Sequence, residues 1–273
     1  MKTALITGGT SGIGLSIVHA LLLQNYRVYF IGRNAKKGTN VEKELHKLYP
    51  NNAHFIELDL SNISQVKTFA KQFLKDNKSL DLLANVAGVM EREQTLTDEG
   101  FEKTFAVGYL SAVVLSTELL PLLEKSQQAR IVNVAGVQSF IFKARLDFND
   151  LTFSKNYSSF KTAITTVHAK TVFTQILADK LKDKSIDVNA FHPGAVRSDL
   201  MFNMPWWAKL MSTLLSPVMS KTSKTGIYVC SNNDIQGVTG KYFKNKKQVT
   251  INFDVDYKKQ LWLHTEVLLK NVN

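Results

Sequence analysis

The first sixteen residues, MKTALITGGTSGIGLS, constrain the fold of this chain more than any other stretch. An apolar run at residues 3–6 is followed by a glycine-rich turn at residues 7–14 and then by a helical pattern at residues 15–23. In this order, glycines let the backbone turn sharply and approach a pyrophosphate, while free N–H groups and the helix dipole attract the anion. The stretch therefore predicts a nucleotide site.

Apolar strand-like runs alternate with helical patterns through most of the chain. The strands expected after the first are 28–31, 54–58, 80–84, 129–134 and 186–191. The expected helices are 38–48, 65–74, 101–123 and 159–181, and Ser61 is expected to cap the second of them. This alternation predicts an α/β fold, a single-domain Rossmann-type doubly wound parallel sheet over residues 1–273 with helices on both faces. Ligands of such sheets bind at the carboxyl ends of the strands.

Composition narrows the class of protein. Hydrophobic residues make up 44% of the chain, enough for a large core, and 14 Gly and 5 Pro without low-complexity tracts argue against disorder. A single cysteine, Cys230, cannot form an internal disulfide, and no cysteine pair suggests a metal site. With no readable signal peptide and no long apolar run, we expect a cytoplasmic protein.

The net charge of +11 raises the question of anionic partners. The lysines are spread along the chain, so we expect solvated helix faces and no nucleic-acid binding.

Residues 205–220, an apolar insertion with Trp206 and Trp207, interrupt the alternation of strands and helices where a lid over the site would lie. Membrane contact through 205–219 is the less favoured alternative, because the segment is short and carries little charge.

Several motifs together carry a family resemblance. They are Thr7-Gly8-x-x-x-Gly12-x-Gly14, Asp59-Leu60, Asn85-Val86-Ala87-Gly88, His192-Pro193-Gly194, Phe173-Thr174-Gln175, Gly240-Lys241-Tyr242-Phe243 and Leu261-Trp262. With them the chain resembles the short-chain dehydrogenases/reductases, and within these the retinol-dehydrogenase-like branch, over its whole length. The resemblance implies cofactor contacts from Gly8, Thr10, Ser11, Gly12, Ile13, Gly14, Asp59, Leu60, Asn85, Ala87, Gly88, Pro193, Gly194 and Ser198. It also implies a dimer or tetramer built through the two long helices, 101–123 and 159–181.

The end of the second strand indicates which nicotinamide cofactor is preferred. An acidic residue there would bind the ribose diol of NAD and repel a 2′-phosphate. This strand instead ends in Arg33, whose guanidinium can pair with a phosphate, and Lys36 and Lys37 add positive charge. NADP(H) is therefore favoured over NAD(H).

The residues at the catalytic positions break the family pattern. The family uses a tyrosine acid/base, a lysine one helical turn further on, a serine and an asparagine. In register with His192 and with Phe173-Thr174-Gln175, these positions are occupied as follows: tyrosine by Ala163, lysine by Val167, serine by Gly136 and asparagine by Gly108. All four are apolar or lack a side chain, so the catalytic residues stay unassigned.

Three polar residues are candidate replacements. Tyr157 and Lys161 match Tyr-x-x-x-Lys, but they lie six residues before Ala163 and Val167, about 9 Å along a helix. Lys170 lies two turns beyond Ala163 on the same helix face and could point towards the cofactor.

Three functions stay open on the sequence alone. The chain could perform non-standard oxidoreductase or other chemistry on a bulky apolar small molecule, for which small residues at positions 163 and 167 leave room. It could be an inactive cofactor-binding pseudoenzyme that serves as a partner subunit or sensor. It could also be an ordinary NADPH-dependent carbonyl or retinol-type reductase that uses Tyr157 and Lys161.

Overall fold

A mostly parallel sheet forms the centre of the molecule in a computed structural model that describes residues 1–194, 196, 220 and 222–272. Its strands are β1 (Thr3–Thr7), β2 (Arg27–Gly32), β3 (Ala53–Glu57), β4 (Leu82–Asn85), β5 (Ala129–Val134), β6 (Ile186–Phe191), β7 (Tyr242–Lys244) and β8 (Lys247–Val249). They lie in the order β3-β2-β1-β4-β5-β6-β7-β8. All neighbours pair in parallel except β7 and β8, which form an antiparallel hairpin at one edge.

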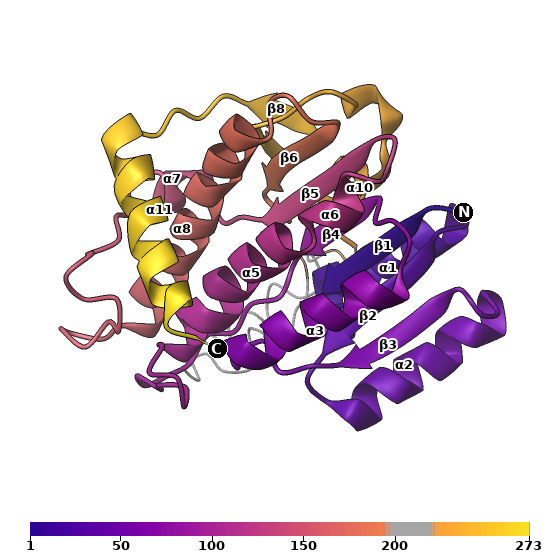
Figure 1. Cartoon of the computed structure of the whole chain (residues 1–273), viewed down its shortest axis with the longest axis horizontal. Helices are drawn as coiled ribbons and strands as arrows, with labels where there is room; N and C mark the ends of the chain where they lie inside the picture. Colours follow the sequence, from indigo (N-terminus) through magenta and orange to yellow (C-terminus); the bar gives the residue numbers. More distant parts are fainter. Residues whose placement is uncertain (195, 197–219, 221, 273) are drawn as a thin grey trace.

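Helices cover both faces of this sheet, as the sequence predicts (Figure 1). One face packs against α3 (Ile63–Asp76), α5 (Ser111–Glu118) and α8 (Ser159–Lys180), and the other against α1 (Gly12–Leu23), α2 (Ala35–Leu48) and α10 (Lys224–Ser231). Shorter elements are α4 (Lys103–Phe105), the π-helical turn η1 (Ala106–Leu110), α6 (Leu120–Leu123), α7 (Gln138–Ile141) and the 3-10 turn η3 (Asn233–Ile235). None of the described helices is both long and apolar enough to cross a membrane.

Two local predictions are wrong. The expected helix 101–123 is divided into α4, η1, α5 and α6, with Pro121 in the first turn of α6, where its missing N–H breaks no intrahelical bond. The cap of α3 is Asn62, whose side chain accepts from the Gln65 N–H (2.9 Å). The Ser61 hydroxyl instead donates to Asp59 Oδ1 (2.8 Å), because Asp59 precedes it in the same turn.

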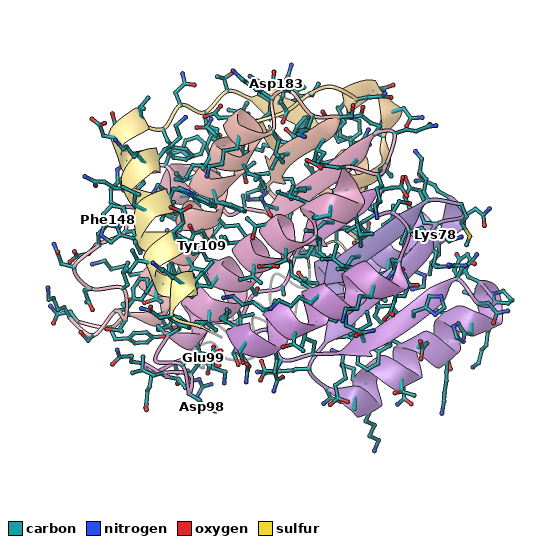
Figure 2. All side chains as sticks on the ribbon, viewed as in Figure 1. Lys78, Asp98, Glu99, Tyr109, Phe148 and Asp183 are labelled. Atoms are coloured by element: carbon teal, nitrogen blue, oxygen red, sulfur yellow. The ribbon has the colours of Figure 1, made fainter. Side chains whose placement is uncertain are left out.

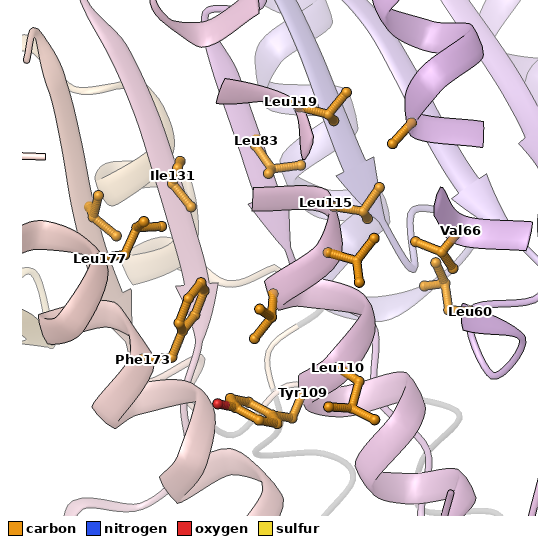
Figure 3. Close-up of a cluster of buried hydrophobic side chains, with 14 of the residues drawn as sticks. Leu60, Val66, Leu83, Tyr109, Leu110, Leu115, Leu119, Ile131, Phe173 and Leu177 are labelled. Carbon is orange, nitrogen blue, oxygen red and sulfur yellow. The ribbon is translucent and has the colours of Figure 1, made fainter. Parts of the chain in front are cut away.

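The C-terminal helix α11 (Val255–Lys270), which the sequence patterns do not predict, lies along the outer side of α8 (Figure 1). Trp262 stacks on Phe173 of α8 with the ring planes 7° apart, and the hydroxyls of Thr265 and Tyr109 are 2.7 Å apart. Figure 3 shows Tyr109 and Phe173 meeting in the core between η1 and α8. In this structure α11 therefore covers part of α8, one of the two long helices through which the sequence predicts pairing of subunits.

A buried histidine ties α11 and α8 to the chain that follows β5. His168 Nδ1 lies 2.6 Å from the Ile141 carbonyl oxygen, so this nitrogen carries the proton and donates. Nε2, 3.0 Å from the Tyr257 hydroxyl, then accepts, and the Tyr257 oxygen in turn accepts from the Leu146 N–H (2.9 Å). Burial lowers the pKa of His168 to about 4, which keeps the ring neutral.

This arrangement makes the stability of the fold depend on pH. His168 has a folded-state pKa of about 4 against an ordinary 6.5, so the unfolded chain binds its proton first as the pH falls. We expect the stabilisation to be complete above pH 6.5 and to be lost progressively towards pH 4, on the order of 3 kcal/mol in total. Urea unfolding of the wild type and of His168→Phe at several pH values measures it.

The variant should be less stable than the wild type at pH 8, because the Ile141 carbonyl and the Tyr257 hydroxyl lose their partner. The stability difference between the two should shrink as the pH falls. His264→Gln on α11 is the control and should keep the wild-type profile. A difference that is constant with pH would contradict the prediction.

Candidate cofactor site

The turn between β1 and α1 is shaped by close backbone approaches. Gly8 adopts φ +68°, and a Cβ there would lie 3.0 Å from Ala87 Cα. A Cβ on Gly14 would lie 2.2 Å from the Gly8 carbonyl oxygen, so no other residue fits. The N-cap Ser11 makes no side-chain hydrogen bond to the first turn of α1, which leaves those N–H groups available. The result is a cradle that suits an anionic phosphate.

Thr7 joins this cradle to the end of β4. Its Oγ1 accepts from the N–H groups of Val86 (2.9 Å) and Ala87 (3.0 Å), and all three residues are buried or half-buried. These bonds hold residues 85–88 against the cradle. The sequence motif includes Thr7 but gives no sign of this joining role.

Arg33 lies beside the same cradle. The Gly9 N–H donates to the Ile31 carbonyl (3.1 Å), and a Cβ on Gly32 would meet the Thr10 methyl at 2.7 Å, so β2 ends against the glycine turn. The Arg33 side chain is exposed and makes no hydrogen bond or ion pair within the described part of the chain. Its guanidinium is thus open to an anionic ligand.

Four further residues predicted to contact the cofactor follow β3 and β6, which lie on opposite sides of β1 in the sheet. After β3, Asp59 Oδ1 accepts from the N–H and hydroxyl of Ser61, at 2.9 and 2.8 Å, while Leu60 is buried. After β6, Gly194 adopts φ +81°, and the Pro193 carbonyl accepts from the Ser223 hydroxyl (2.9 Å). Ser198 and residues 205–219 of the expected lid lie outside the described residues.

A ring of buried polar residues closes the site from beneath. Asn85 Nδ2 donates to Asn133 Oδ1 (2.9 Å), Asn133 Nδ2 donates to the Thr174 hydroxyl (3.0 Å), and that hydroxyl donates to the Lys170 carbonyl (3.0 Å). Lys170 Nζ completes the ring by donating to the Asn85 carbonyl (3.4 Å). The Asn85 side chain is therefore turned into the interior, while Ala87 is half-buried and Gly88 is exposed.

The positions that the sequence assigns to the family's catalytic residues lie on α8 or pack against it. A Cβ on Gly136 would lie 3.1 Å from Ile141 Cγ2 and 3.3 Å from Val167 Cγ1. A Cβ on Gly108, which lies in η1, would lie 2.6 Å from Thr166 Cγ2 on α8. Ala163 and Val167, one turn apart on α8, are both partly exposed. The surface here is built of small apolar groups.

Tyr157 and Lys161 are engaged elsewhere. The Tyr157 hydroxyl donates to the Glu91 carbonyl (3.0 Å) and lies 3.5 Å from Glu102 Oε1, and burial raises its pKa to about 12. Lys161 is exposed near the start of α8, where its N–H donates to the capping Ser158 hydroxyl. These contacts do not bring either side chain to Gly136 or Val167.

A hollow of about 530 Å³ lies away from the cradle, between the start of α3 and the end of α11. Glu99, Thr152 and Asn271 are among its lining residues. Glu99, labelled in Figure 2, accepts from the N–H groups of Ile63 (2.8 Å) and Ser64 (2.7 Å) and so serves the N-terminus of α3. None of the residues assigned to the cofactor lines this hollow.

The sequence is similar to proteins of known family. The family "short chain dehydrogenase" matches residues 2–208. Retinol dehydrogenase 12 of Mus musculus is 33% identical over 271 residues, which cover 96% of this chain and 84% of the relative. Short-chain dehydrogenase TIC 32 B, chloroplastic, of Brassica napus is 31% identical over 267 residues, covering 93% and 83%.

Solved structures share the fold. A protein of Mycobacterium paratuberculosis superposes with a TM-score of 0.75 at 22% identity, covering 99% of this chain and 94% of that one. A blue fluorescent protein from a metagenomic library, solved in complex with NADPH, superposes with a TM-score of 0.68 at 20% identity, covering 89% and 95%.

We expect the Thr7 hydroxyl to contribute substantially to the free energy of unfolding, through its bonds at the cofactor site. In Thr7→Val the N–H groups of Val86 and Ala87 lose their acceptor, so we expect a loss of about 1–3 kcal/mol per orphaned donor. Chemical unfolding measures the effect. Thr7→Ser keeps the hydroxyl and should lose far less. Equal losses in the two variants would show that the methyl group, not the hydroxyl, stabilises the junction.

Proposed function

Since this chain belongs to the short-chain dehydrogenase/reductase family, in its retinol-dehydrogenase-like branch, we propose that it binds NADP(H) and acts as an oxidoreductase with non-standard proton chemistry on a bulky, apolar small molecule. The observation that carries the proposal is that Gly8 and Gly14 form a phosphate cradle in a chain whose Gly136, Ala163 and Val167 offer only small apolar groups.

The residues present fit the cofactor. The close approaches at Gly8 and Gly14 leave backbone N–H groups for a pyrophosphate, and the open guanidinium of Arg33 suits a 2′-phosphate. Asp59 retains one carboxylate oxygen, Oδ2, that takes no part in the bonds to Ser61 and can accept a hydrogen bond from the cofactor. When bound, the nicotinamide supplies or accepts a hydride.

The side chains at positions 163 and 167 determine which kind of substrate the site can take. Ala163 and Val167 are partly exposed and offer no group that exchanges protons, so the proton must come from elsewhere. Their small volume leaves space above α8, which favours a bulky substrate held by apolar contact. A general acid contributes about 10²–10⁴-fold to such a reaction, so its absence slows turnover without abolishing it.

A second candidate function is a cofactor-binding pseudoenzyme, favoured by the small residues at all four aligned positions. Retention of NADPH binding with no turnover of any aldehyde or ketone would identify it.

The alternative of an ordinary reductase would need the Tyr157 hydroxyl to give up its contacts with Glu91 and Glu102. A Tyr157→Phe variant with undiminished activity would eliminate that alternative. We place the protein in the cytoplasm, because its single cysteine, Cys230, is buried and unpaired.

Arg33 should decide between the two cofactors. In Arg33→Asp the 2′-phosphate of NADPH loses a charge-assisted partner and meets a carboxylate, so we expect its affinity to fall at least 10-fold and NADH to be preferred. Calorimetric titration with NADPH and NADH measures both. Arg27→Asp at the opposite end of β2 is the control and should bind both cofactors as the wild type does. Equal losses in the two variants would mean that Arg33 acts only through net charge.

Restoring the aligned side chains should restore ordinary carbonyl reduction. We expect Gly136→Ser/Ala163→Tyr/Val167→Lys to reduce simple aldehydes with NADPH about 10²-fold or more faster than the wild type. Gly108 is left unchanged, because a side chain there would meet Thr166. Gly136→Ser/Ala163→Phe/Val167→Met is the matched control without acid and amine. A folded, NADPH-binding triple variant with no gain would contradict the assignment of these positions.

A further inference from the structure

Lys170 is buried without a counter-charge. It lies in the middle of α8 with 1% of its surface exposed, and burial alone lowers its pKa, to about 7 against an ordinary 10.5. No carboxylate among the described residues pairs with its Nζ, whose one bond is the long contact to the Asn85 carbonyl (3.4 Å). An ammonium offers three donors, so at least two N–H bonds have no partner.

Two acceptors nearby have no partner either. Asn85 Oδ1 and Thr166 Oγ1 are fully buried and accept or donate no hydrogen bond within the described residues. Asn85 is the residue whose carbonyl Lys170 contacts, and Thr166 lies one turn before Lys170 on the same side of α8. An unsatisfied buried polar group costs about 1–3 kcal/mol, so unused donors on Lys170 and unused acceptors on these two adjoining residues point to a small polar ligand.

We propose that Lys170 is the proton-exchanging group of this site and that it acts through a water molecule held by Asn85 Oδ1 and Thr166 Oγ1. The inference rests on the function proposed above and supplies the acid that Ala163 and Val167 lack. One water has the two donors and two acceptors needed to join these groups. Because Lys170 acts through water, it is a positioning and proton-supplying residue.

The proton balance of the step is simple. During reduction the Lys170 ammonium gives one proton to the water, and the water gives one of its own to the substrate oxygen that becomes a hydroxyl. The amine is left neutral and regains a proton through the same water, once the product has left and solvent reaches the site. In the oxidative direction the same path runs backwards, with the neutral amine as the base.

The other ionisable groups packed around α8 do not compete for this role. The Tyr109 hydroxyl of η1 is bound to Thr265, and Glu102, before α4, accepts from the Phe105 N–H. His168 on α8 is bound to Ile141 and to Tyr257 of α11. Asn85, whose carbonyl Lys170 contacts from the end of β4, carries no charge, and neither does Asn133 of β5, which bonds Asn85 and Thr174.

The titration of Lys170 tests the first half of the proposal. With lysine labelled by 13C at Cε, the wild-type spectrum should hold one resonance that titrates near pH 7, well below the ordinary value of about 10.4 for a lysine amine. That resonance should be missing in Lys170→Met and kept in Lys182→Met, an exposed lysine just beyond α8. Titration of Lys170 together with the exposed lysines would overturn the proposal.

Replacement of Thr166 tests the bound water. If the Thr166 hydroxyl holds a water, Thr166→Val removes a satisfied group and should lower the urea midpoint of unfolding. If nothing binds there, removing an unsatisfied hydroxyl should raise the midpoint, which would overturn the water-mediated path. Thr166→Ser keeps the hydroxyl and serves as the control.

Proton exchange on cofactor binding links the cluster to the site. Calorimetry with NADPH at pH 7.5, in two buffers of different ionisation enthalpy, should show a fraction of a proton exchanged by the wild type and by Lys182→Met. Lys170→Met should lack that fraction, and equal exchange in all three would overturn the proposal. If the wild type binds no NADPH while Lys170 titrates near pH 7, the proposed function is refuted. The lowered pKa of Lys170 would then be a separate property of the protein.

Discussion

The approach of the β1–α1 turn to the end of β4 is the contact on which the site depends. It brings Gly8 so close to Ala87, and Gly14 so close to the Gly8 carbonyl, that neither glycine can carry a side chain. The Thr7 hydroxyl then fastens the two segments with hydrogen bonds to two backbone N–H groups. The first helix, the glycine turn and residues 85–88 are thereby held as one rigid piece, and the other strands add their carboxyl ends to the same edge.

Hydrophobic periodicity predicted the sheet well because each buried strand is a continuous apolar run. Strands 129–134 and 186–191 agree with the structure at both ends. Periodicity failed where local backbone geometry decides how a helix begins or continues. The π-helical turn at Ala106–Leu110 looks like ordinary helix in sequence, and Asn62 rather than Ser61 became the cap because Ser61 was already bound to Asp59.

The sequence assigned the candidate site to the carboxyl ends of the strands, where the glycine cradle lies in the structure, but it could not give the direction of the side chains there. The motif containing Asn85 suggested a cofactor contact, whereas its amide faces inward and joins the buried ring with Asn133. Helical spacing put Lys170 on the face of Ala163, yet only the packing of η1 and β4 around it shows that it is sealed from solvent. Chemistry that arises from burial depends on neighbours distant in sequence, and spacing along one helix does not contain them.

The C-terminal helix has a consequence for how copies of this chain can meet. Trp262 and Thr265 of α11 contact Phe173 and Tyr109 within the same molecule, so α11 is a covalently linked partner of the surface that it covers. A tether of this kind holds its partner at an effective concentration in the millimolar range. Each molecule therefore covers this side of α8 with its own C-terminal segment, and a second chain at micromolar concentration would compete for the same side against roughly a thousand-fold excess.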